Sequence, residues 1–480
     1  MPGRRAGVGN FGMSQAEETK IMLQEDMKVV IMAAGEGTRM RSSLPKVLHQ
    51  AAGKCLVEWV ADAARAVTEK PVLIYGNGGE AIRERFGEAF TYALQAQRLG
   101  TGHAVMAARE QIAGSKYTIV LAGDMPLVRP ETIKRLAEEA IAADCDCMLL
   151  TASPEKTPAY GRIVRDAQGK ICRIVEDKDA TPEQKQIKEL NISFYCFKTP
   201  ALLEALDQLK PENAQHEYYL TDCIQVLYEA GKEVRSIDIG DMQECMGVNT
   251  RVQLAEAEAA LRARINEKLM LSGVTMIDPT NTYIGADVEI GQDTLIYPGV
   301  ILEGKCRIGS GCILYQGSRI RDSIVGDGTT VENSVLLQAE AGSCSKVGPN
   351  AYLRPGTRIG NHCRIGDFVE TKNAVIGDGT KVSHLTYVGD AQLGEDINIG
   401  CGVVFVNFDG KEKKMTTVGD GAFIGCNTNL ISPVQVGAGA YIAAGTTVTK
   451  DVPEDALAIG RARELVKAGW AKGRYKIHRE

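Results

Sequence analysis

A six-residue repeat in the C-terminal part of the chain is the feature that most constrains the fold. A period of six fits neither the 3.6-residue turn of an α-helix nor the plain alternation of a β-strand. Its aliphatic positions form three runs: Ile284, Ile290, Ile296, Leu302, Ile308, Leu314 and Ile320; Val347, Leu353, Ile359 and Ile365; and Val418, Ile424, Leu430, Val436, Ile442 and Val448. Glycine often follows directly, and glycine permits the positive φ of a tight corner. The pattern therefore predicts short strands stacked in coils around an aliphatic column. Two interruptions, near 331–346 and 405–417, are expected to be loops extruded from the coil.

The composition agrees with a change of architecture near residue 272. Of 51 glycines, 20 fall in residues 1–271 and 31 in residues 272–480, and aromatic residues make up only 5% of the chain. A hydrophobic content of 44% excludes a disordered protein, and a net charge of −6 argues against a nucleic-acid partner. No apolar run reaches the roughly 20 residues that span a bilayer, so we expect no membrane insertion.

The cysteines and the N-terminus indicate the compartment. The 13 cysteines are scattered and never form a C-x-x-C pair, so we interpret them as buried thiols of a cytoplasmic protein rather than as a disulfide framework or a zinc site. Residues 1–26 contain no apolar run, so we do not expect a secretory signal peptide there. We expect them to be a disordered extension.

From Met27 onwards, buried-type strands alternate with helical segments. We expect strands at 29–32, 72–75 and 117–121, and helices at 56–67 and 131–143. This alternation predicts a parallel sheet with ligands at the carboxyl ends of its strands. Residues 251–271 have helical spacing and no proline, and predict one long helix that connects two domains.

The loop after the first strand is rich in small residues. It reads Ala33-Ala34-Gly35-Glu36-Gly37-Thr38-Arg39-Met40, which is neither G-x-G-x-x-G nor a Walker A sequence. Its backbone amides could approach phosphates, and Arg39 and Lys46 could bring positive charge to a triphosphate. On these grounds alone the loop could also be an ordinary turn between a strand and a helix.

Together with Leu44-Pro45-Lys46, this loop resembles the signature of sugar-phosphate nucleotidyltransferases. The resemblance extends over residues 28–475 to the bacterial bifunctional family that joins an N-acetylglucosamine-1-phosphate uridyltransferase to a glucosamine-1-phosphate acetyltransferase. It implies an α/β nucleotidyltransferase domain with a Rossmann-like mixed sheet at 27–250, a linker helix at 251–271, and a left-handed parallel β-helix of hexapeptide repeats at 272–480. It also implies a homotrimer.

The resemblance assigns roles in the first domain. The phosphates and nucleotide of UTP would contact Ala33, Ala34, Gly35, Arg39 and Lys46, and its uracil would contact Gln95, Gly100 and Thr101. The sugar would contact Gly161, Glu176 and Asn191. Mg²⁺ would be held by Asp124 and Asn249. Attack of a sugar phosphate on UTP joins two anions, so charge neutralisation and positioning matter more than a protein nucleophile. From the residues alone, Asp124 could instead cap a helix, and Asn249 could be a turn residue.

A second group of polar residues interrupts the repeat. Neutral imidazole is suited to taking a proton from an amine that attacks a thioester, although a lone histidine is usually structural. By resemblance His384 is the general base of acetyl transfer to glucosamine 1-phosphate. The sugar phosphate would be bound by Arg354, Lys372, Tyr387 and Asn398, and acetyl-CoA by Cys401, Asn407, Phe408, Cys426, Ala444 and Arg461. The basic tail around Gly469-Trp470 resembles the family's terminal segment, or is simply solvated.

Several residues depart from the family's pattern. Ala159 stands at a usual glycine, and Ile192-Ser193 replaces a usual Thr-Gly beside the sugar positions. In the coenzyme set, Cys401, Phe408 and Cys426 stand where alanine, tyrosine and serine respectively are found. We give these cysteines a binding role and no nucleophilic one in acetyl transfer, since direct transfer needs no acyl-cysteine.

The leading hypothesis is a cytoplasmic enzyme that makes UDP-N-acetylglucosamine for cell-wall precursors, with UTP and acetyl-CoA as co-substrates and Mg²⁺ as cofactor. Three alternatives remain open at this point. They are a single-activity nucleotidyltransferase whose coil is only regulatory, a scaffold with degenerate sites, and a relative that uses another nucleotide such as dTTP.

Overall fold

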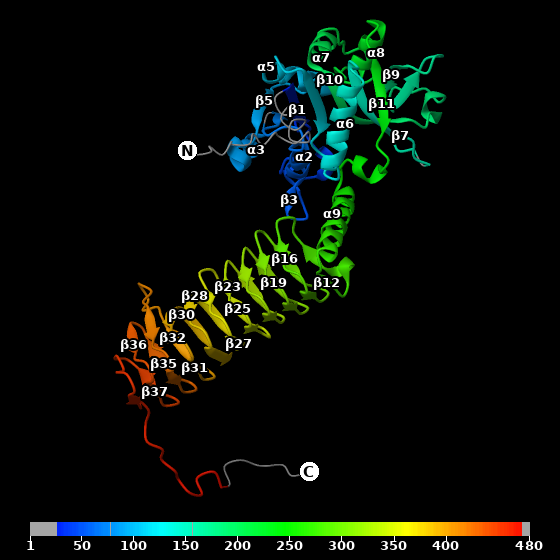
Figure 1. Cartoon of the computed structure of the whole chain (residues 1–480). Coiled ribbons are helices and arrows are strands. Elements are labelled where there is room, and N and C mark those ends of the chain that lie inside the picture. Colours follow the sequence, from blue (N-terminus) through cyan, green and yellow to red (C-terminus); the bar gives the residue numbers. More distant parts are fainter. Residues whose placement is uncertain (1–25, 77, 156, 473–480) are drawn as a thin grey trace, which may run out of the picture. The chain divides into compact units, whose positions relative to one another are not determined.

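The computed structural model describes residues 26–472 except 77 and 156, so the extension predicted at 1–26 lies, apart from residue 26, outside the described residues. The chain divides into two compact units, Met1–Leu261 and Arg262–Glu480 (Figure 1). The boundary falls within helix α9 (Arg251–Leu271), which has the bounds of the expected connecting helix. Among the described residues, no helix has the length and apolarity needed to cross a membrane.

The first unit is built on a nine-stranded mixed sheet in the order β11-β7-β10-β6-β1-β4-β5, with β8 and β9 at one side. Its strands are β1 (Met27–Met32), β4 (Val72–Gly76), β5 (Thr91–Gln95), β6 (Tyr117–Ala122), β7 (Cys147–Ala152), β8 (Arg162–Arg165), β9 (Ile171–Val175), β10 (Leu190–Lys198) and β11 (Val234–Asp238). The Rossmann-like mixed sheet implied by the resemblance is confirmed. The simpler expectation of a parallel sheet is wrong at β10, which returns from the β8–β9 hairpin and pairs antiparallel to both β6 and β7.

Helices bury both faces of this sheet. One apolar core joins it to α2 and α6, and the other joins it to α4, α5, α7 and α8. The helices are α2 (Leu56–Ala64), α3 (Glu80–Phe86), α4 (Thr101–Ala107), α5 (Arg109–Ile112), α6 (Pro130–Ala142), α7 (Thr199–Leu206) and α8 (Asp222–Glu229). Because β1, β4, β5 and β6 run parallel, their carboxyl ends meet at one edge.

The second unit is a stack of coils whose strands all pair in parallel, in sheets of 11 and 17 strands (Figure 1). One sheet contains β12 (Thr275–Met276), β15 (Leu295–Ile296), β18 (Ile313–Leu314), β21 (Thr330–Val331), β24 (Lys346–Val347), β27 (Arg364–Asp367), β29 (Lys381–His384), β31 (Asn398–Ile399), β34 (Phe423–Ile424), β37 (Tyr441–Ile442) and β39 (Leu457–Ala458). The repeat therefore folds as predicted, into a β-helix of hexapeptide repeats.

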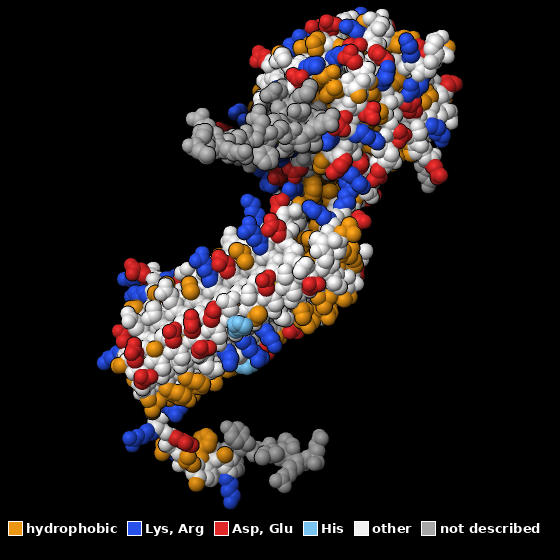
Figure 2. Space-filling view, viewed as in Figure 1, with side chains coloured by type: hydrophobic (Ala, Val, Ile, Leu, Met, Phe, Trp, Pro, Cys, Tyr) orange, Lys and Arg blue, Asp and Glu red, His pale blue; other side chains and the backbone are white. Residues whose placement is uncertain are grey.

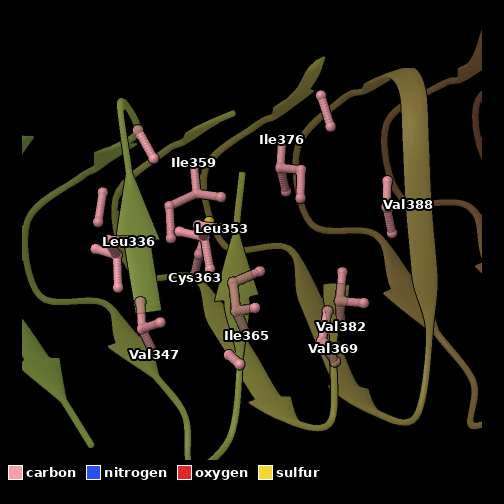
Figure 3. Close-up of a cluster of buried hydrophobic side chains, with 14 of the residues drawn as sticks. Leu336, Val347, Leu353, Ile359, Cys363, Ile365, Val369, Ile376, Val382 and Val388 are labelled. Carbon is pink, nitrogen blue, oxygen red and sulfur yellow. The ribbon is translucent and has the colours of Figure 1, made fainter. Parts of the chain in front are cut away.

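The aliphatic repeat positions form a single core within the coils. Figure 3 shows part of it, with Leu353, Ile359 and Ile365 turned towards the same interior. All the positions of the three runs are buried except Ile290, which is partly buried and packs against the core. Each coil thus buries its apolar residues against the coils before and after it.

One of the two predicted interruptions is wrong. Residues 331–346 form an ordinary coil, in which β22 (Val335–Leu337) and β23 (Glu340–Ala341) pair in parallel with their neighbours. The period of six is lost there because two sides of the coil are one residue shorter, so Leu336 and Ala341 carry the core positions. The segment near 405–417 does leave the coil, between β32 (Val404–Val406) and β33 (Thr416–Val418).

Candidate functional sites

A cavity of about 670 Å³ opens at the carboxyl edge of the first unit's sheet. The residues predicted for UTP and magnesium converge on it from the loops after β1, β5 and β6. Its lining includes Ala33, Ala34, Gly35, Lys46, Gln95, Gly100, Thr101 and Asp124, which were predicted, and Glu36, Arg98, Ser193 and Glu217, which were not.

Glycine is required where the first loop meets Lys46. Gly37 has φ of 63°, and a Cβ placed on it would lie 2.6 Å from Cβ of Lys46. Any other side chain would therefore meet both a left-handed backbone and a clash with the lysine stem. Because Gly37 lets the loop close over this stem, the ammonium group is held at the cavity wall.

Four predicted residues form one polar cluster beside the cavity. Lys46 makes an ion pair with Asp124, its Nζ lies 3.0 Å from Oδ1 of Asn249, and Arg39 donates to the same Oδ1 over 2.9 Å. The amide of Val248 donates to the carbonyl of Asp124 over 2.8 Å, which fastens the segment before α9 to the end of β6. A carboxylate oxygen and an amide oxygen thus converge on one cation, the ammonium group of Lys46.

The same two oxygens fit a magnesium ion. Mg²⁺ prefers hard oxygen ligands and needs only one or two protein groups when phosphate oxygens and waters complete its shell. Within the residues that the structure describes, no group of three or more His, Cys, Asp or Glu side chains could hold a metal. A magnesium ion at Asp124 and Asn249 would therefore need further oxygen ligands from a bound phosphate and from water.

Arg98 is a cavity residue for which we predicted no role. Its Nε donates to the carbonyl of Ala34 over 3.0 Å, and its Nη1 lies 2.5 Å from Oε1 of Glu36. The guanidinium group thereby ties the segment after β5 to the first loop. The only signal available was a cation inside Gln95–Thr101, and nothing in the sequence pairs it with residues more than 60 positions away.

The segment predicted to meet uracil is held rigidly. Gln95 is buried and donates from Nε2 to the carbonyl of Gly100 over 3.0 Å. Gly100 has φ of 111°, and a Cβ on it would lie 2.5 Å from the carbonyl oxygen of Tyr218. Thr101 begins α4 and accepts a hydrogen bond from the amide of Leu220. These contacts leave the rim of the cavity little freedom.

The predicted sugar residues lie together: Gly161 directly precedes β8, Glu176 directly follows β9, and Asn191 lies in β10. The amide of Asn191 donates to the carbonyl of Gly161 over 2.8 Å, and Oε1 of Glu176 accepts from Thr221 over 3.2 Å. Desolvation by burial raises the pKa of Glu176. Among the departures, Ile192 is fully buried, whereas Ser193 lines the cavity with a left-handed φ of 61°.

The carboxylate of Asp222 near this site predicts a pH-dependent stability. Desolvation by burial, and then the charge of Asp179, raise its pKa to about 6, above the value of about 3.9 in an unfolded chain. Because the folded state favours the protonated acid, this stabilising contribution is present at low pH and lost as pH rises through 6. The free-energy cost of ionising Asp222 is reduced because the residue is partly exposed and lies in the first turn of α8. Asp222→Asn should raise the unfolding free energy by about 1 kcal/mol at pH 7.5, and the gain should vanish near pH 4.

Urea unfolding followed by the fluorescence of Trp59, in a Trp470→Phe background, measures this difference in the first unit. Glu80→Gln, which changes an exposed carboxylate at the start of α3, is the matched control and should behave alike at both pH values. A gain for Asp222→Asn of the same size at pH 4 and pH 7.5 would contradict the assignment.

The second predicted site follows one corner of the coils. His384 ends β29 and is in register with Asp367 of the preceding coil. Ile365 pairs with Val382, Val382 with Ile399, Ile399 with Ile424, and Ile424 with Ile442. The residues two positions after these form a column, which we call the corner column: Asp367, His384, Cys401, Cys426 and Ala444. The predicted base and three predicted coenzyme residues are therefore stacked on successive coils.

The predicted sugar-phosphate residues lie on the neighbouring strands. Arg354 follows β25 (Tyr352–Leu353) and makes a 2.7 Å ion pair with Glu370. Lys372 lies in β28 (Glu370–Ile376), and its side-chain hydrogen bond with Lys413, followed by the positive charges of Lys413 and Arg354, lowers the pKa of its ammonium group. Figure 2 shows histidine atoms beside a group of Lys and Arg side chains on the surface of this unit. Such a group of cations suits a phosphate.

Tyr387, Asn398 and Asn407 complete this region in different ways. Tyr387 begins β30 (Tyr387–Leu393), and its hydroxyl accepts a 3.4 Å hydrogen bond from Nδ2 of Asn407. Asn407 also donates to Asp390 over 2.5 Å, which anchors the extruded loop on the coil. Asn398 lies within β31, in register with Lys381 rather than at the corner.

The remaining coenzyme residues are less closely gathered. The guanidinium of Arg461 donates to the carbonyl of Ala444 over 2.7 Å, at the end of the corner column. Phe408 is 55% exposed on the extruded loop, where it pairs with Lys413. Its ring is available to a ligand from outside the coil.

Comparison with known proteins agrees with both halves. Residues 29–219 match the MobA-like NTP transferase domain, and residues 287–322 and 415–450 match the bacterial transferase hexapeptide (six repeats). The bifunctional protein GlmU of Clostridioides difficile (strain 630) is 49% identical over 448 residues, which cover 93% of this chain and 98% of that protein. The bifunctional protein GlmU of Clostridium novyi (strain NT) is 50% identical over 444 residues, which cover 92% and 97% respectively. The predicted resemblance is confirmed, and the chain belongs to the bifunctional GlmU family.

Proposed function

We propose that the chain makes UDP-N-acetylglucosamine in two steps. The second unit transfers acetyl from acetyl-CoA to glucosamine 1-phosphate, and the first unit then couples N-acetylglucosamine 1-phosphate to UMP from UTP with release of pyrophosphate. The observation that carries this proposal is the presence, on two separate folds of one chain, of the Lys46–Asp124–Asn249 cluster and of the corner column that contains His384.

For uridylyl transfer, the cluster would neutralise charge. Asp124 and Asn249 would hold Mg²⁺, which would supply Lewis-acid stabilisation of the developing phosphate charge. Lys46 and Arg39 would exchange their present partners for triphosphate oxygens. Glu176, Asn191 and Gly161 would orient the sugar phosphate in line with the α-phosphorus, since positioning is the main contribution a protein can make to this reaction.

For acetyl transfer, His384 would remove a proton from the attacking amine. Within the described part of the chain neither ring nitrogen of His384 has a hydrogen-bond partner, so the imidazole remains available to substrate. Arg354 and Lys372 would bind the phosphate of glucosamine 1-phosphate, with Tyr387 and Asn398 at the sugar. The thioester would lie along the corner column, directly beside the base.

We also propose a cytoplasmic homotrimer. Phe368 and Leu385 flank the corner column with side chains 62% and 61% exposed, which favours burial against another chain. All 13 cysteines are free thiols, as is usual in a reducing compartment. Sedimentation equilibrium should give three times the chain mass, whereas a stable monomer would contradict this part of the proposal.

A product assay tests the two activities. The full chain is incubated with acetyl-CoA, glucosamine 1-phosphate and UTP, with and without magnesium, and free CoA and pyrophosphate are measured separately. We expect CoA release in both conditions and pyrophosphate only with magnesium. CoA release without any UDP-sugar, or turnover with dTTP in place of UTP, would contradict the assignment.

A further inference from the structure

Two exposed cysteines lie next to each other in the corner column. The amide of Gly400 donates to the carbonyl of Ile424 over 2.8 Å, and the amide of Asn427 donates to the carbonyl of Cys401 over 2.8 Å. These two hydrogen bonds bracket Cys401 and Cys426, so the two residues face each other across neighbouring coils. Both are exposed, whereas most other cysteines of the chain are buried.

This placement suits a disulfide. Neighbouring parallel strands lie about 4.8 Å apart, and the Cα atoms of bonded cysteines are usually about 4.4–6.8 Å apart. Cys344 is also exposed, but its neighbours at the same corner are Gly328 and His362, so no second thiol is adjacent. Among the exposed cysteines, only Cys401 and Cys426 therefore have a thiol partner within reach.

We propose that Cys401 and Cys426 form a dithiol site that reacts with low-molecular-weight disulfides and closes a reversible disulfide bond. The Cys401 thiolate attacks the small disulfide, forms a mixed disulfide and releases one small thiol. The Cys426 thiolate then attacks the Cys401 sulfur and releases the second small thiol. The enzyme dithiol loses two protons and two electrons, and one small disulfide becomes two thiols, so the exchange is balanced.

The closed bond would affect only one of the two activities. The bond would join two residues of the corner column between His384 and Ala444. According to the proposed function the thioester lies there, and the expected loss of acetyl transfer rests on that function. Neither sulfur would then be a free thiol that can contact the coenzyme, and the bond would link the two coils covalently. We expect at least a tenfold loss of acetyl transfer, recovery with dithiothreitol, and an unchanged rate of uridylyl transfer.

The experiment treats the full chain with oxidised glutathione, alkylates the remaining thiols and measures the intact mass and the cross-linked peptides. The expected product contains a Cys401–Cys426 cross-linked peptide that has lost two hydrogens and carries no glutathione on either residue, whatever the isolated thiol of Cys344 retains. Cys401→Ala and Cys426→Ser should each retain a glutathione on the remaining member of this pair. The matched control Cys344→Ser should close the same bond as the unaltered chain.

Two results would overturn the proposal. They are stable glutathione adducts on both cysteines of the unaltered chain, and a bond that joins two chains in a non-reducing gel. The mass measurement does not depend on activity. If untreated protein shows no acetyl transfer while the bond forms, the proposed function fails and the dithiol site stands; if acetyl transfer is present and no bond forms, only the dithiol site fails.

Discussion

His384→Ala should lower the turnover number of acetyl transfer by about 10²- to 10⁴-fold, the usual contribution of a general base. The corner column contains one imidazole, that of His384, and one carboxylate, that of Asp367, so these are its only two groups that could accept the proton of the amine. Uridylyl transfer should remain within a factor of two, because the first unit has its own sheet and cores. Release of free CoA and of pyrophosphate, measured on the same preparation, gives both rates.

His362→Asn is the matched control for this substitution. His362 is exposed at another corner of the second unit and has φ of 55°, which asparagine tolerates well. Both activities should persist in this variant. Loss of both activities in a folded His384→Ala chain would contradict the division into two sites, and acetyl transfer within tenfold of the unaltered rate would contradict the role of the base.

Asp124→Asn should reduce uridylyl transfer by about 10³-fold or more, because a loss of about 4 kcal/mol of metal-assisted charge stabilisation corresponds to that factor. The substitution keeps the size of the side chain but removes the charge that faces Lys46 and, in the proposed complex, Mg²⁺. Acetyl transfer should be unaffected. Pyrophosphate release over a magnesium titration should show both a lower maximum and a higher half-saturating concentration.

Asp62→Asn controls for the loss of any ion-paired aspartate in the same unit. Asp62 contacts Lys54 over 2.9 Å on α2, away from the cavity lining. This variant should retain both activities. An Asp124→Asn enzyme that keeps magnesium-dependent uridylyl transfer within tenfold of the unaltered rate would refute the proposed metal site.

The sequence was most informative where local chemistry determines structure. The aliphatic repeat predicted the core of the second unit because each coil buries its residues against its neighbours, and the loop after β1 predicted the cavity because parallel strands end at a common edge. The prediction of an extruded loop at 331–346 was wrong, because a coil with shorter sides keeps its strand pairing but loses the period of six. Hydrophobic spacing reports a coil only when its sides have equal length.

Contacts between segments that are distant along the chain could not be predicted from the sequence. The clamp of Arg98 on Ala34 and Glu36 depends on the strand order β1-β4-β5, and the antiparallel β10 depends on the β8–β9 excursion. The corner column was also hidden, because His384, Cys401 and Cys426 are separated by unequal numbers of residues. Only the observed register places them on successive coils.

That unequal spacing shows that the register between coils is kept even where the number of residues per coil changes. Ile399 pairs with Ile424 although the extruded segment lies between them, so this segment adds length without shifting the alignment of any later coil. An insertion or deletion there preserves the register, while the loss of a single residue inside a strand such as β31 would turn inward-facing aliphatic residues to solvent. The loop that carries Asn407 and Phe408 can therefore change in length without shifting the register, while the stack that carries His384 cannot.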